Sequence, residues 1–197
     1  MKSVLFLSLI LSLLSASRAY ADWDGAQLLF VGAVENVHLS GEGDRITLRA
    51  SVHSFWSTKN DTRLWLGYCG FKAKFTDKLW MSPQVGVAGN WRPGGGDAFL
   101  TSLWTGFAPS RRTFLFVEND IYVHGGGMDY YGYYFLDWAA SGDIAIGPTV
   151  EQVNANVTVG PHVTLSTKAG PWISAQYWIA AQSSLHQTIR FVVGLFF

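Results

Sequence analysis

The sequence predicts an all-β chain whose strands pair with their neighbours as hairpins and close into an antiparallel up-and-down barrel. Segments of about 10 to 14 residues alternate with short clusters of Gly, Asn, Asp, Ser and Pro, residue types that favour turns. The segments themselves are rich in Val, Ile, Tyr, Phe, Trp and Thr, which favour strands. Beyond residue 21, no segment shows an apolar stripe with the 3.6-residue period of a helix. A chain of β-hairpins explains all three observations.

The first 21 residues have the pattern of a secretory signal peptide. Lys2 supplies a positive start, an apolar stretch from Val4 to Leu14 follows, and Ala19-Tyr20-Ala21 matches the small-residue cleavage rule. The apolar run of about 11 residues is too short for a membrane-spanning helix, which needs about 20. We therefore expect an exported protein that is cleaved after Ala21, with residues 22–197 forming one domain.

Eleven segments satisfy the criteria for strands. In chain order they are residues 26–38, 45–56, 62–75, 78–91, 98–108, 112–124, 129–140, 143–152, 156–168, 171–182 and 187–197. Apolar and polar residues alternate with period two in the clearest of them, 45–55, 112–124, 156–168 and 172–182. In 45–55, one face consists of Ile46, Leu48, Ala50 and Val52, and the other of Arg45, Thr47, Arg49, Ser51 and His53.

The composition of the chain excludes several classes of protein. Aromatic residues make up 15% and charged residues 14%, against about 25% charged residues in ordinary soluble domains, so a disordered chain is excluded. Without the leader, 12 basic residues stand against 14 acidic ones, which argues against a nucleic-acid-binding protein. Cys69 is the only cysteine, which excludes a disulfide framework and a cysteine-rich zinc site.

Two architectures produce alternating strands of this kind. A soluble barrel places the apolar face inside, whereas a membrane barrel places it outside, against lipid. The predicted strands are long for a soluble sheet but suit a tilted membrane strand, and their polar faces are poor in Lys and Glu. The tyrosine cluster at 130–134 and several tryptophans near strand ends are typical of interfacial girdles. These tryptophans are Trp56, Trp80, Trp91 and Trp172. The sequence therefore favours the transmembrane barrel.

The last ten residues form an amphipathic strand that ends on an aromatic residue, Thr188-Ile189-Arg190-Phe191-Val192-Val193-Gly194-Leu195-Phe196-Phe197. This strand resembles the assembly signal of bacterial outer-membrane β-barrel proteins, with Phe191, Val193, Leu195 and Phe197 as its apolar face. The resemblance covers the leader, this strand and the general strand pattern. It implies a monomer in the outer membrane of a Gram-negative cell, inserted by the barrel-assembly machinery, with lipopolysaccharide as its outer-leaflet neighbour.

The number of strands is the weak point of the prediction. Single-chain bacterial barrels have an even number of strands, so we expect ten or twelve and favour twelve. Glu35 and Asn36 blur the faces of 26–38, while Arg63 and Lys72 fall on opposite faces of 62–75. A register shift in 62–75, or a segment that is split or lies outside the wall, would restore an even number. By strand counting, the glycine-rich turns 92–97 and 124–129 lie on one side, the outer one.

The polar faces carry charged residues that we expect to lie in the lumen. They are Glu35, Arg49, His53, Glu118, Asp120, Asp137, Glu151, His162, Lys168 and Arg190. Buried charges must pair or meet water, so we interpret them first as a network of ion pairs that fills and stiffens the barrel, with Arg190 facing Glu118, Asp120 or Glu151. The alternative is a narrow pore whose charged walls set ion preference. A barrel of about 10 to 12 strands lies between the filled eight-stranded kind and the open porins.

A lipid-modifying barrel enzyme is a further alternative. It needs a Ser hydroxyl within hydrogen-bond reach of a His that an acid orients. His162 and Ser166 share a face but lie about 13 Å apart along a strand, and Thr164 is a poor nucleophile. The glycine-rich turns are not followed by the helix that a phosphate site requires. We therefore predict no catalytic residue, no metal site and no cofactor.

The predicted function is that of a structural envelope protein or a narrow, porin-like passive pore with a polar, charge-lined lumen. A soluble secreted β-barrel that binds a small apolar ligand is the remaining alternative.

Overall fold

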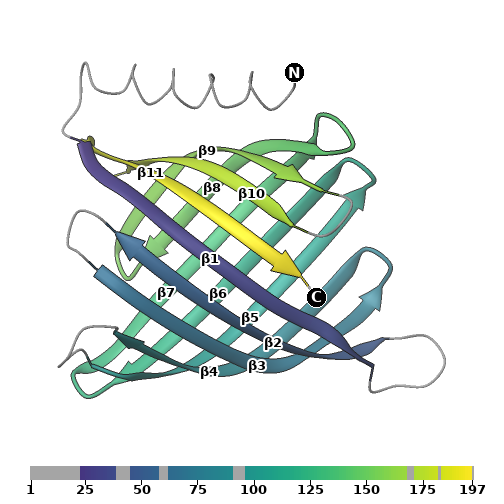
Figure 1. The fold of residues 1–197 in the computed structure, drawn as a ribbon, viewed down its shortest axis with the longest axis horizontal. Coiled ribbons are helices and arrows are strands. Elements are labelled where there is room, and N and C mark those ends of the chain that lie inside the picture. Colours follow the sequence, from purple (N-terminus) through teal and green to yellow (C-terminus); the bar gives the residue numbers. More distant parts are fainter. Residues whose placement is uncertain are drawn as a thin grey trace.

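A computed structural model describes residues 23–38, 45–57, 62–90, 96–167, 171–181 and 183–196. In these ranges the chain forms one closed barrel of eleven strands (Figure 1). The strands are β1 (Trp23–His38), β2 (Ile46–Ser57), β3 (Thr62–Thr76), β4 (Leu79–Asn90), β5 (Ala98–Ser110), β6 (Thr113–His124), β7 (Gly127–Ala139), β8 (Ile144–Val153), β9 (Asn156–Ser166), β10 (Trp172–Ala180) and β11 (Ser183–Phe196). The described ranges contain no helix that is long and apolar enough to cross a membrane.

The count of eleven corrects the expectation of ten or twelve strands. All eleven predicted segments lie in the wall, and each pairs antiparallel with its neighbours in the sequence. With an odd number of hairpin-connected strands, the first and last strands run in the same direction. The barrel therefore closes through a parallel pair, in which β1 meets β11 from Ala26↔Ile189 to Ala33↔Phe196.

Both ambiguous segments contain a register shift against a neighbouring strand. The register between β1 and β2 shifts between Val34 and Val37, the place where Glu35 and Asn36 interrupt the alternation. The β3 strand pairs with β2 without a shift from Ile46↔Ala73 to Ser57↔Thr62, but its register with β4 shifts between Lys74 and Thr76. The expected shift in 62–75 is therefore present near the end of β3, and it does not make the number of strands even.

The two rims of the barrel carry different residues. The rim with the β4–β5 and β6–β7 connections includes Gly96 and 125–127, and we call it the glycine rim. On the opposite rim lie the β3–β4 and β5–β6 turns and the end of β11. The described residues of this rim include more basic than acidic side chains, and we call it the basic rim. The basic residues there are Arg45, Lys74, Lys78, Arg111 and Arg112, against Asp77 and Asp143. In Figure 1 the basic rim is on the right.

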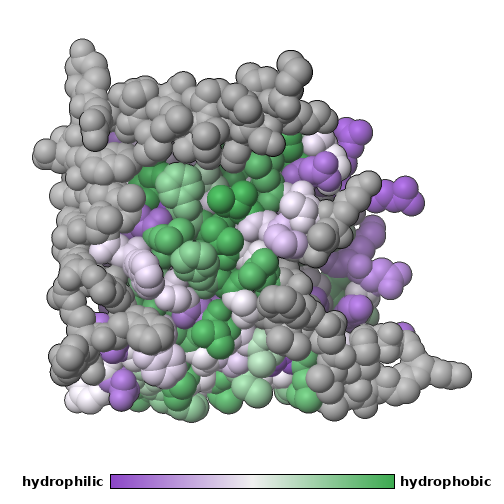
Figure 2. All heavy atoms as spheres, viewed as in Figure 1, coloured by the Kyte–Doolittle hydropathy of each residue, from purple (hydrophilic) through white to green (hydrophobic). Residues whose placement is uncertain are grey.

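The apolar faces of the strands point outward. On β2, Ile46, Leu48 and Val52 are exposed, whereas Arg49 and His53 are buried. The other strands repeat this arrangement, with Val85, Phe99 and Ile121 among the exposed side chains. Figure 2 shows hydrophobic side chains gathered over the middle of the visible wall and hydrophilic ones at the right-hand end. The barrel is thus apolar outside, and its interior combines polar, aromatic and aliphatic side chains.

Part of the interior is a packed core. Leu66 and Tyr68 of β3, Ala88 of β4, and Leu100 and Trp104 of β5 form one buried cluster, in which Leu100 is fully buried. Trp80 and Phe116 pack against it. Side chains from β3 to β6 therefore fill one side of the lumen.

Three tryptophan rings cover glycines on the neighbouring strand, and each of the three pairs is in direct register. Trp80 of β4 lies opposite Gly106 of β5, Trp65 lies opposite Gly89, and Trp172 lies opposite Gly194. A Cβ added at Gly106 would lie 2.2 Å from Trp80 Cε2, a separation that real side chains do not adopt. The glycines therefore make room for the rings.

We expect Gly106→Ala to destabilise the barrel by about 1–3 kcal/mol, because the added methyl group overpacks the Trp80 ring. The measurement is urea unfolding followed by tryptophan fluorescence. Gly67→Ala is the matched control, since a Cβ at Gly67 has no atom within 4 Å. Equal unfolding midpoints for the two variants would show that the Trp80 ring does not need the space over Gly106.

Candidate functional site

A cavity lies inside the barrel. Its volume is about 830 Å³, and its lining reaches from Asp129 and Leu64, close to the glycine rim, to Ser166 and Trp172, close to the basic rim. The cavity borders the packed core on one side, where Trp104 and Phe116 line it. The lumen is therefore only partly filled by side chains.

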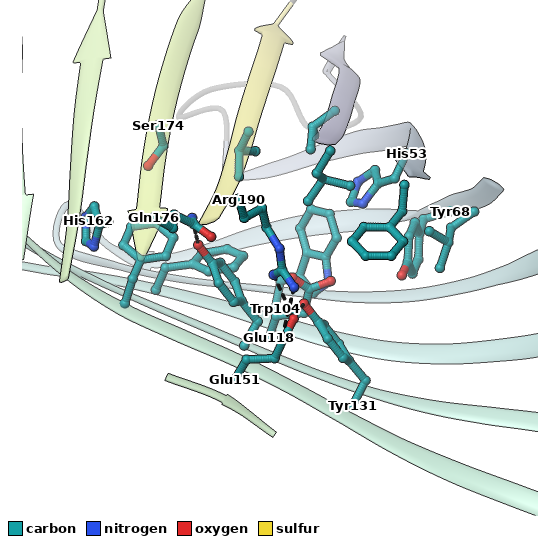
Figure 3. A pocket seen from close by; sticks show the side chains of 18 of the residues that line it. His53, Tyr68, Trp104, Glu118, Tyr131, Glu151, His162, Ser174, Gln176 and Arg190 are labelled. Carbon is teal, nitrogen blue, oxygen red and sulfur yellow. Dashed lines mark hydrogen bonds and ion pairs between the residues drawn. The ribbon is translucent and has the colours of Figure 1, made fainter. Parts of the chain in front are cut away.

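An ion pair crosses the lumen between β11 and β8. Arg190 Nη1 and Nη2 donate to Glu151 Oε1 and Oε2, at 2.7 and 2.9 Å. Arg190 Nε donates to Gln27 Oε1 at 2.8 Å, and Tyr131 Oη donates to Glu151 Oε1 at 3.0 Å. The guanidinium carbon also lies 5.1 Å from the centre of the Trp178 ring. Figure 3 shows the pair at the centre of the pocket. These contacts tie five strands together across the interior.

A second polar cluster surrounds Asp120 on β6, which has no exposed surface. Its Oδ2 accepts a hydrogen bond from Tyr68 Oη at 2.7 Å, and its Oδ1 accepts one from Ser102 Oγ. Tyr68 belongs to β3, so the first bond spans two intervening strands. Buried carboxylates are tolerated only where such donors replace water. Glu118, buried on the same face, lies opposite Trp104 in the β5–β6 register.

Arg49 and Lys72 form a cationic group on aromatic rings nearer the basic rim. The Arg49 guanidinium lies 4.3 Å from the centre of the Trp104 ring and 5.7 Å from that of Trp80. The Lys72 ammonium lies 4.5 Å from the Trp80 ring. Such contacts are worth about 0.5–2 kcal/mol each, depending on desolvation. Both cationic side chains line the cavity.

His162 and Asp137 form a dyad on the wall of the cavity. His162 Nε2 lies 2.5 Å from Asp137 Oδ1, and the Phe135 ring meets the imidazole edge-on at 5.6 Å. His162 Nδ1 is buried and has no hydrogen-bond partner among the described residues. Within the same residues, His53 Nε2 also lacks a partner, and its ring packs against Tyr68 and Trp104.

The arrangement an acyl-transfer enzyme needs is not formed by these histidines. His162 contacts a carboxylate, and His124 accepts from Gly126 N and contacts Asp129. In the part of the chain that the structure describes, neither these two nor His53 contacts a Ser or Thr hydroxyl through a hydrogen bond. No group of three or more His, Cys, Asp or Glu there could hold a metal ion.

The structure places most of the predicted lumen residues inside the barrel. Arg49, His53, Glu118, Asp120, Asp137, Glu151, His162 and Arg190 all lie in the lumen, and all but Asp120 line the cavity. Of the three acids that sequence reasoning offered as partners for Arg190, the ion pair is formed with Glu151. The side chain of Glu35 and the whole of Lys168 lie outside the described residues.

The expected assembly-signal face can be followed in part. Leu195 is exposed and Phe191 and Val193 are partly exposed, whereas Val192 and Gly194 between them are buried. These residues of β11 therefore alternate with the lumen-facing Arg190, as predicted. Phe197 lies outside the described residues.

Sequence reasoning misplaced several aromatic residues. Trp80 and Trp172, expected in an outer girdle, line the cavity, as do Tyr131 and Tyr133 of the tyrosine cluster. Trp56 is exposed as expected, and Trp91 lies outside the described residues. Strand parity was the available signal, because Tyr131 and Tyr133 share a face with Asp137, a residue assigned to the lumen.

A cluster of hydrogen-bonded polar side chains lies on the outer face of β6 and β7. Asn119 Oδ1 accepts hydrogen bonds from Tyr130 Oη at 2.7 Å and Tyr134 Oη at 2.9 Å. The two hydroxyls approach each other over Gly132, which lies opposite Asn119 in the register. The amide oxygen in the outward face is thus satisfied without water.

Comparison of the chain with protein-family models and with curated proteins found no match.

Proposed function

We propose that the protein is a bacterial outer-membrane β-barrel that encloses a narrow, passive passage for small solutes. One observation carries this proposal: a cavity of about 830 Å³ reaches towards both rims inside a closed wall whose outward side chains are apolar.

The outward face supports a membrane location. Large apolar side chains such as Val52, Val85 and Phe75 are more than half exposed, and comparable residues lie on every side of the wall. Soluble monomers rarely expose contiguous apolar surface of this extent, whereas lipid covers it on a membrane barrel. The same face argues against the soluble ligand-binding barrel, which would direct its apolar residues inward. The leader pattern and the last strand support export to the outer membrane.

The interior supports a passage that is narrow. Arg190 and Glu151 meet across the lumen, and the packed core of β3–β6 occupies another part of it. The charges that remain on the wall, including Asp137 and Lys72, would act on any ion that passes. We propose the monomer as the functional unit, insertion by the barrel-assembly machinery, and lipopolysaccharide as its neighbour in the outer leaflet.

A structural envelope role is the second candidate, and the cross-lumen contacts favour it. The bonds Arg190–Glu151, Tyr68–Asp120 and Gln176–Tyr133 each join strands that are not neighbours. Bracing of this kind stiffens a barrel whether or not solutes cross it.

Planar-bilayer conductance of the refolded protein separates the two candidates. We expect small discrete steps from the unchanged protein. The double variant Arg190→Ala/Glu151→Ala should give larger steps, because it removes the side chains that cross the lumen. Arg111→Ala/Asp143→Ala, which also removes one charge of each sign but at the exposed basic rim, should leave the step size unchanged.

If protein that is shown to be inserted gave no conductance steps, this result would contradict the passage and leave the structural role. Protein that stays soluble without detergent would contradict the membrane location itself.

A further inference from the structure

The wall of the cavity contains a continuous apolar band on four adjacent strands. Val192 of β11 pairs with Leu29 of β1, Leu29 pairs with Phe55 of β2, and Phe55 pairs with Leu64 of β3. All four side chains line the cavity. Because they are directly opposite one another in register, they form one row across the lumen wall, including the β1–β11 closure.

A second row extends the band towards the basic rim. Val31 lies opposite His53, and His53 lies opposite Leu66; these three side chains line the cavity as well. The facing wall is aromatic, with Phe114, Phe116, Phe135 and Tyr133 in a chain of ring contacts 5.1 to 6.4 Å apart. One side of the cavity is therefore aliphatic and the facing side is aromatic, and we call the space between these two walls the slot.

A barrel that is filled by its own side chains does not explain such a slot. In the packed core, apolar side chains bury one another, and Leu100 and Trp104 are almost wholly inaccessible. Leu29, Phe55 and Leu64 instead retain intermediate exposure and face the cavity. A volume of about 830 Å³ falls in the range of small-molecule sites, which are about 300–1,000 Å³ and mostly apolar.

The charge around the cavity indicates which end a polar headgroup would take. Towards the basic rim the cavity is lined by Arg49 and Lys72, and beyond them the described residues of the rim include more basic than acidic side chains. The lining at this end also includes Asp137, which contacts His162. Towards the glycine rim the lining includes Asp129 and the ion pair of Glu151 with Arg190. The two cationic side chains therefore favour an anion at the basic end.

We propose that the lumen binds a single-chain amphipath with an anionic headgroup, such as a long-chain carboxylate. The hydrocarbon chain lies between the row of Leu29, Phe55 and Leu64 and the aromatic wall, and the headgroup lies towards Arg49 and Lys72. This inference goes beyond the proposed passage, because a chain can bind without any ion crossing the lumen.

Native mass spectrometry of the folded protein, released from a nonionic detergent, tests the proposal with hexadecanoate as the probe. We expect a saturable complex with one hexadecanoate, and about tenfold weaker retention of hexadecyltrimethylammonium, which has the same chain length and the opposite charge. Butyrate, with the same headgroup and almost no chain, should not be retained. Equal retention of the cationic and anionic chains would overturn the assignment of the headgroup.

Variants of the apolar row locate the chain. Leu29→Gln and Leu64→Gln should each lower hexadecanoate retention, whereas Leu29→Met, which keeps an apolar side chain, should preserve it. Because the lumen already contains polar side chains, a Gln at these positions is compatible with folding. Folding of each variant is verified by its resistance to unfolding in detergent without heating. If both Gln variants retained as much hexadecanoate as the unchanged protein, the proposed binding site would be refuted, even if the protein conducted ions in planar bilayers. Loss of conductance with retained binding would refute only the passage.

Discussion

Replacement of Arg190 by Met is expected to destabilise the folded barrel by about 3–5 kcal/mol, the usual cost of breaking a buried ion pair from one side. The side chains of Arg190 and Glu151 are only 5% and 14% exposed. Removal of the guanidinium leaves the Glu151 carboxylate with the Tyr131 hydroxyl as its remaining donor. It also removes the bond to Gln27, which lies on the other side of the β1–β11 closure.

Urea unfolding in lipid vesicles, followed by tryptophan fluorescence, measures this effect. The double variant Arg190→Met/Glu151→Met is the control, because an apolar pair in place of a buried ion pair is often neutral or stabilising. We therefore expect the double variant to be more stable than Arg190→Met alone, which gives a favourable coupling energy in the double-mutant cycle. Additive losses in the two single variants would mean that the two charges do not interact.

The second large effect is expected at Val85, in the middle of β4 on the outer face. Its side chain is 52% exposed, and its neighbours in register are Cys69 and Thr101. Val85→Arg should cost about 2–4 kcal/mol if this position lies at the bilayer midplane, and a charge close to the interface should cost only about 0–1 kcal/mol. The matched variant is Met128→Arg, on the same face at the glycine rim, where the side chain is 72% exposed.

The depth dependence is what distinguishes membrane from water. On a soluble protein, both positions are surface sites, where substitutions stay within about 0.5 kcal/mol of neutral. Equal small effects of Val85→Arg and Met128→Arg would therefore contradict the membrane barrel. A large effect at Val85 alone would establish an apolar environment around the middle of β4.

Much of the local structure could be predicted because it depends on neighbours in the sequence. Alternation in 45–55 correctly separated the buried Arg49 and His53 from the exposed Leu48 and Val52. The irregularity at Glu35 and Asn36 was visible as a break in the pattern and appears as a register shift in β1. The same periodicity placed Glu118 and Asp120 on the inner face of β6.

The errors concern residues whose environment depends on the barrel as a whole. Trp80 was assigned to an outer girdle because it lies near a strand end, yet its ring faces the lumen over Gly106. Proximity to a strand end says how deep a side chain lies, but not on which side of the wall. For Trp80, the parity with the buried Ser82 and Gln84 was the better guide.

The sequence by itself determined that the chain is all-β, where the strand segments lie, and which face of most strands is apolar, because these properties follow from residue type and period-two spacing. Only the tertiary structure decided how the barrel closes and which residues meet inside it. The residues of a strand do not identify the strand with which it pairs. The parallel pairing of β1 with β11 is therefore seen only when the sheet closes into a barrel. The meeting of Arg190 with Glu151, and the row of Leu29, Phe55 and Leu64 along the cavity, depend on that closure and on the register it imposes.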